Sequence, residues 1–76
     1  MAASRADVDR WIAEAKNKGA KFIISVCDTF DWDDYPVYVM PGESLAEVKS
    51  EYSGQNMQRI NEVIQILPDG TVKEGL

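Results

Sequence analysis

A chain of 76 residues, 45% of them hydrophobic and 28% charged, has the composition of one soluble globular domain. Its net charge of -5 disfavours direct nonspecific binding to nucleic acid, because Lys and Arg supply most of that affinity. The sequence contains no histidine, which removes the commonest general base and the commonest metal ligand.

The cysteine content and the distribution of apolar residues predict a cytoplasmic protein. Cys27 is the only cysteine and cannot form a disulfide within the chain, which is typical of a reducing compartment. No apolar run approaches the roughly 20 residues that a membrane-spanning helix needs, so no membrane partner is expected. The first ten residues lack the apolar segment of a secretory signal peptide.

The first predicted element is a helix over residues 5–18. Ser4 and Asp7 have the spacing of a capping box, and apolar residues then recur at helical intervals. Gly19 follows the last turn and can adopt the left-handed conformation that ends a helix. We interpret Trp11, on the apolar face of this helix, as a core residue that packs on a sheet.

A β-hairpin is predicted over residues 22–40. Its strands, Phe22 to Thr29 and Tyr35 to Met40, are rich in β-branched and aromatic residues and alternate in polarity. Phe30 continues the apolar face of the first strand in this interpretation. Pro36 has no N–H to donate, so the second strand is expected to start with its proline or to lie at an exposed edge.

A second helix over residues 45–53 and a second hairpin over residues 60–74 complete the predicted fold. Leu67-Pro68-Asp69-Gly70 is typical of a turn, because proline presets φ and glycine supplies a positive φ. The element order α-β-β-α-β-β predicts one α+β domain over residues 1–76. We expect two layers, with both helices on one face of a four-stranded antiparallel sheet.

The connection between the first two strands is the leading candidate site. It combines acids with aromatic side chains, and we interpret it as a surface that binds a basic region of a partner protein. Its candidate residues are Asp31, Trp32, Asp33, Asp34 and Tyr35. A polar segment before the third strand provides a second candidate surface, which consists of Asn56, Gln58 and Arg59.

The acidic residues match no known metal loop. An EF-hand loop starting at Asp31 would place Tyr35 at the third ligand position and Gly42 where the bidentate Glu belongs. Cys27 lies inside a predicted strand and has no histidine to activate it. P-loop, GxSxG and dinucleotide-binding motifs are also absent. We therefore expect no catalytic residue, no metal, no cofactor and no enzyme activity.

Two segments, VCDTFDWDDYPVYVMPGE and EYSGQNMQRINEV, resemble a group of small hypothetical proteins encoded by bacteriophages. The resemblance covers residues 8–63 and includes an Asn-Met-Gln-Arg segment. No activity is established for that group. The resemblance therefore implies an accessory phage protein made in an infected bacterium, and it carries over no catalytic residue.

Three functions are consistent with these features. The first is a small acidic inhibitor that binds a host defence factor stoichiometrically, as anti-CRISPR proteins do. The second is a homo-oligomeric sponge for a nucleotide signalling molecule, in which Tyr or Trp stacks on the base and Arg59, Lys21 or Lys49 contacts phosphate. The third is a metal-dependent enzyme that uses the aspartate cluster. We favour the first because recognition needs no catalytic motif.

Overall fold

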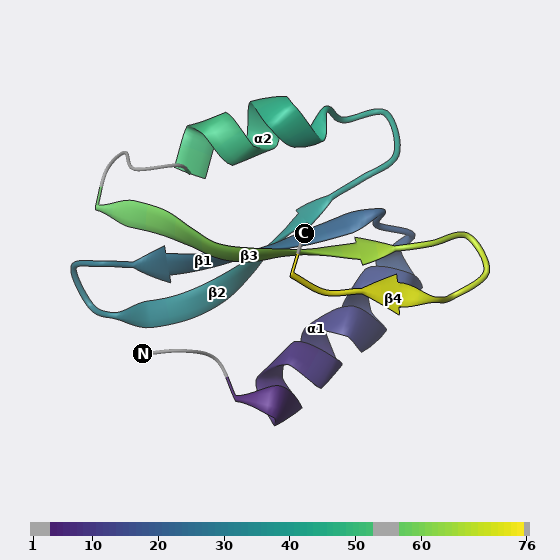
Figure 1. The fold of residues 1–76 in the computed structure, drawn as a ribbon, viewed down its shortest axis with the longest axis horizontal. Helices are drawn as coiled ribbons and strands as arrows, with labels where there is room; N and C mark the ends of the chain where they lie inside the picture. Colours follow the sequence, from purple (N-terminus) through teal and green to yellow (C-terminus); the bar gives the residue numbers. More distant parts are fainter. Residues whose placement is uncertain (1–3, 53–56, 76) are drawn as a thin grey trace.

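The computed structural model describes residues 4–52 and 57–75 of the chain (Figure 1). It contains two helices and a four-stranded antiparallel sheet, so the predicted α+β class and element order are confirmed. The elements are α1 (Arg5–Lys18), β1 (Phe22–Asp28), β2 (Asp33–Val39), α2 (Leu45–Tyr52), β3 (Gln58–Ile66) and β4 (Val72–Lys73). Neither helix in the described part of the chain is long and apolar enough to cross a membrane.

Local signals fix both ends of α1. The Ser4 hydroxyl accepts a hydrogen bond from the Asp7 N–H at 3.2 Å, and the Asp7 carboxylate accepts one from the Ser4 N–H at 3.3 Å. This reciprocal capping box satisfies two N–H groups that the helix itself leaves unpaired. Gly19 ends the helix at φ 78°, a conformation that glycine adopts without a Cβ penalty.

The sheet has the strand order β2-β1-β3-β4, so the most apolar strand lies between two neighbours. β1 pairs along its whole length with β2, from Phe22 opposite Val39 to Asp28 opposite Asp33. β3 pairs with the other edge of β1 and shifts register between Ser25 and Val26. β2 forms an edge of the sheet, which is where a strand tolerates the proline it contains.

The turn between β3 and β4 follows the predicted chemistry. The Gly70 N–H donates to the Leu67 carbonyl at 2.9 Å, and Gly70 has φ 89°. The Asp69 carboxylate accepts a hydrogen bond from the Thr71 N–H at 2.9 Å, which holds the pKa of Asp69 below its usual value. β4 is short and pairs with the last two residues of β3.

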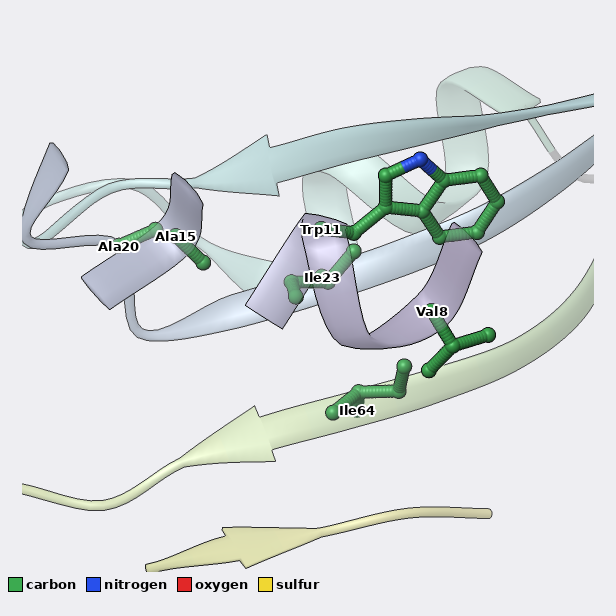
Figure 2. Packing of buried hydrophobic residues seen from close by; sticks show 6 residues of the cluster. All are labelled: Val8, Trp11, Ala15, Ala20, Ile23 and Ile64. Carbon is green, nitrogen blue, oxygen red and sulfur yellow. The ribbon is translucent and has the colours of Figure 1, made fainter. Parts of the chain in front are cut away.

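The two helices lie on opposite faces of the sheet, and the prediction that both cover one face is wrong (Figure 1). α1 contributes Val8, Trp11 and Ala15 to a cluster that includes Ile23 and Ile64, as Figure 2 shows. Trp11 is 5% exposed, which confirms its interpretation as a core residue. α2 covers the other face, where its partly buried apolar side chains pack against Ile24, Val26, Val39 and Val63.

The burial of β1 on both faces is the physical reason for this arrangement. Successive side chains of a strand point to opposite faces, and both Ile23 and Ile24 are fully buried. A strand that is apolar at consecutive positions needs cover on both sides. One helix on each face provides that cover, whereas two helices on one face would leave half of these side chains in water.

Several element boundaries differ from those predicted. β1 ends at Asp28, so Phe30 lies beyond the strand and not on its apolar face. β2 begins at Asp33, two residues before the predicted start. β3 already begins at Gln58, because it follows β1 to the end of the sheet. The predicted end of the second helix, residue 53, lies outside the described residues.

Candidate functional site

A four-residue connection, residues 29–32, closes the hairpin of β1 and β2 at one end of the sheet. The Trp32 N–H donates to the Asp28 carbonyl at 2.6 Å, and the Asp28 carboxylate accepts a hydrogen bond from the Phe30 N–H at 2.9 Å. Trp32 takes a left-handed conformation at φ 59°. Asp28 therefore shapes the turn through backbone hydrogen bonds, as short polar side chains commonly do.

The first residue before β3 joins this connection from the other side. The Met57 carbonyl accepts hydrogen bonds at 2.7 Å from both the N–H and the hydroxyl of Thr29. These two bonds bring Met57 next to the hairpin connection, 28 residues away in sequence. We refer to residues 28–33 together with Met57 as the tip.

The tip carries the large exposed hydrophobic side chains of the described part of the chain. Phe30 is 72% exposed, Met57 is 61% exposed and Trp32 is 55% exposed. Single exposed apolar residues are ordinary on protein surfaces, but a group of large ones in one place indicates an interaction site. Their common position at the end of the sheet follows from the hairpin turn and from the Thr29–Met57 hydrogen bonds.

Aspartates flank Phe30 and Trp32 in the sequence. Asp31 and Asp33 are exposed, and in the described residues neither side chain makes an ion pair. Asp33 lies directly opposite Asp28 in the ladder between β1 and β2. Like charges at directly opposed positions disfavour strand pairing, so we expect this pair to lower the stability of the sheet at the tip.

The structure separates the five predicted site residues into two groups. Asp31, Trp32 and Asp33 lie together at the tip. Asp34 points to the opposite face from Asp33, because side chains alternate along a strand. One of its oxygens accepts a hydrogen bond from the Asn61 amide at 3.1 Å, and the other is buried and has no hydrogen-bond partner among the described residues.

Tyr35 belongs to the packing beneath α2. Its ring meets the ring of Tyr52 edge-on, with centroids 6.5 Å apart and planes at 73°. Its hydroxyl accepts a hydrogen bond from the Gln58 amide. Partial burial raises the pKa of the Tyr35 phenol, and the nearby Tyr52 and Asp28 raise it further. This side chain therefore packs between the sheet and α2, and it offers little surface to a partner.

The second candidate surface does not form a single patch. The Gln58 amide donates a hydrogen bond to the Tyr35 hydroxyl on the sheet face that α2 covers. Arg59 is exposed and pairs in register with Cys27, so it points to the opposite face. Asn56, the third member of this set, lies outside the described residues.

The cations of the nucleotide-sponge hypothesis are far apart in one chain. Lys21 precedes β1 at the end of the sheet remote from the tip. Arg59 lies on β3 and pairs with Cys27 of β1, near the tip. Lys49 lies on α2. Within residues 4–52 and 57–75, no group of three or more Cys, Asp or Glu side chains is placed to hold a metal ion.

Sequence reasoning missed two residues of the tip, Phe30 and Met57. Phe30 fits the alternation of β1, and the signal for its exposure is its position between Asp28 and Asp31, which both favour a turn. Met57 gives no local signal, because its position depends on the pairing of β1 with β3.

No protein-family model, curated protein or solved structure matches the chain. The function is therefore argued from the geometry and chemistry of the tip.

Proposed function

We propose that this chain is a non-enzymatic binding protein and that the tip is the surface that contacts its partner. The observation that carries this proposal is the position of Phe30, Trp32 and Met57 at one end of the sheet, where all three are more than half exposed and the tip also contains aspartates. Exposing three such side chains has a solvation cost, which a partner that buries them would recover.

The two kinds of side chain at the tip have different roles in this proposal. Trp32 and Phe30 are anchors, since aromatic side chains in desolvated pockets provide much of the binding energy of protein interfaces. Asp31 and Asp33 select a basic surface and accelerate the encounter with it. A partner with an apolar hollow rimmed by Lys or Arg matches both features.

The fold supports the tip before any partner arrives. β1 is the central strand with neighbours on both sides, and Asp28 and Thr29 fix the connection through hydrogen bonds. A surface that is already ordered loses little conformational entropy on binding. The tip is therefore suited to bind as a rigid projection.

The resemblance to small bacteriophage proteins supports a host factor as the partner. We propose that the chain acts in the cytoplasm of the infected bacterium and inhibits a defence complex stoichiometrically, in the manner of anti-CRISPR proteins. A nucleic-acid-binding groove is a suitable target, because its Lys and Arg side chains normally face phosphates and would accept the tip's carboxylates instead.

Capture from host lysate tests this proposal. The immobilised chain is compared with the variant Asp31→Lys/Asp33→Lys, which leaves the Asp34–Asn61 hydrogen bond in place. The control is Glu47→Lys/Glu51→Lys on α2, which has the same formal net charge but an unaltered tip. We expect the control to retain the partner and the tip variant to lose it. Equal capture by the two variants would show that the tip is not the interface.

A further inference from the structure

A hollow lies at the end of the sheet opposite the tip. It has a volume of about 730 Å³, within the range of roughly 300 to 1,000 Å³ that is usual for ligand pockets. Residues from the end of α1, the start of β1 and the β3–β4 turn line it, so we call it the terminal pocket. All of its lining residues belong to the described part of the chain.

The terminal pocket combines apolar walls with two free cations. Phe22, Leu67 and Pro68 are among its apolar lining residues, and Lys16 and Lys21 also line it. Among the described residues, neither lysine ammonium group has an ion-pair or hydrogen-bond partner. Asp69 is the one acid in the lining, and its carboxylate is engaged by the Thr71 N–H.

This chemistry complements that of the tip. The tip presents exposed aromatic side chains beside Asp31 and Asp33, and the terminal pocket presents apolar walls beside Lys16 and Lys21. Charge complementarity of this kind sets the orientation in which two surfaces meet.

A single chain cannot join its own tip to its own terminal pocket. β1 runs from Phe22, which lines the pocket, to Asp28, which belongs to the tip. Its six residue steps separate the two by about 20 Å, and the paired strand between them is rigid. A contact between the tip and the terminal pocket can therefore form only between two copies.

We propose that the tip of one copy docks in the terminal pocket of a second copy, so that the protein self-associates head to tail. The contact joins two different surfaces, so each added copy presents a free tip at one end and a free pocket at the other. The inference goes beyond the proposed host partner and does not depend on it. Where both contacts form, they use the same tip and therefore compete.

Sedimentation velocity on the full chain tests the inference with two complementary variants. Asp31→Lys/Asp33→Lys alters the tip and keeps the pocket, whereas Lys16→Gln/Lys21→Gln removes the positive charge of the pocket and keeps the tip. We expect the wild-type sedimentation coefficient to rise with protein concentration, and each variant alone to lose this dependence. An equimolar mixture of the two variants is expected to form a 1:1 dimer that grows no further, because one intact tip meets one intact pocket.

The mixture also controls for folding, since each variant must present one native surface for the dimer to form. A wild-type chain that stays monomeric at all concentrations would overturn the inference, and so would a mixture that stays monomeric. Variants that associate as well as the wild type would also overturn it, because the contact would then lie elsewhere. Loss of host-partner capture would not affect any of these results, so the two proposals can fail separately.

Discussion

Asp28 and Asp33, which are directly opposed in the ladder between β1 and β2, connect the fold of the tip with its proposed role in binding. Asp28 shapes the hairpin through the Phe30 N–H, and Asp33 adds a second negative charge directly across the ladder. Like charges at opposed positions of a ladder are expected to disfavour the pairing. In the proposed complex, a basic surface would relieve this repulsion and so favour the bound state.

Replacing Asp33 by Lys is therefore expected to stabilise the fold. The new ammonium group would face Asp28, and an opposite-charge pair at this position contributes about 0.2 to 1 kcal/mol. Urea unfolding at low salt measures the change in the free energy of unfolding. Asp31→Lys is the control, because Asp31 lies in the connection and has no opposed strand residue. A less stable Asp33→Lys variant would contradict this account of the pair.

Ionisation of Tyr35 makes the stability of the fold depend on pH in the alkaline range. Its pKa is raised above the usual value of 10.0, chiefly by burial, so the folded state retains the phenol proton more strongly than the unfolded state. The stability from this group is therefore complete below pH 10.0 and is lost as pH rises through the folded-state pKa. Tyr38 behaves in the same direction, again chiefly through burial.

The variant Tyr35→Phe is expected to lose less stability at alkaline pH than the wild type. The loss that remains is the contribution of Tyr38. At neutral pH the substitution should cost about 0.5 to 1.5 kcal/mol, because the Gln58 amide loses its acceptor. Urea unfolding from neutral to strongly alkaline pH measures both effects. If the variant lost as much stability at alkaline pH as the wild type, ionisation of Tyr35 would not be linked to folding.

Among the elements, β1 illustrates which features of the fold the sequence predicts and which it does not. Its β-branched content and the flanking turn residues identify a strand, and the capping box with Gly19 defines α1. The run from Ile23 to Cys27 is buried at every position, and that property predicts cover on both faces. Our sequence interpretation derived the layers from the order of the elements and did not take this buried run into account, and it placed both helices on one face.

Conservative truncation of the two isoleucines of β1 tests the opposed helices. Ile23→Val removes one methylene beneath α1, and Ile24→Val removes one beneath α2. Each is expected to lower the free energy of unfolding by about 0.5 to 1.5 kcal/mol. Ile60→Val, at a partly buried position, is a control that should cost less. A negligible effect at either Ile23 or Ile24 would mean that one face of the sheet lacks its cover.

The candidate site was predictable only in part, for reasons that lie in the contacts between elements. The connection with Asp31, Trp32 and Asp33 is visible in the sequence because acids and turn residues interrupt apolar strands. The assignment of Tyr35 to the same surface fails to anticipate its packing against Tyr52. Met57 reaches the tip through strand pairing that no local pattern encodes.

At the scale of the whole molecule, the sheet holds two chemically different ends apart. The tip combines aromatic side chains with acids, and the terminal pocket combines apolar walls with lysines. In the proposed function, a net charge of -5 would attract a basic partner over the range of the Debye length, about 8 Å at physiological salt. The tip then supplies the short-range apolar contact that a surface charge alone does not provide.

The exposure of Trp32 in the complex tests the central claim most directly. The chain contains two tryptophans, Trp11 in the core at 5% exposure and Trp32 in the tip at 55%. Incorporation of 5-fluorotryptophan gives two ¹⁹F resonances, which the variant Trp32→Phe assigns, and the solvent-isotope shift of each reports its exposure. On addition of the captured partner, we expect the isotope shift of Trp32 to collapse while that of Trp11 stays small. A complex that forms with the isotope shift of Trp32 unchanged would contradict the assignment of the tip as the binding surface.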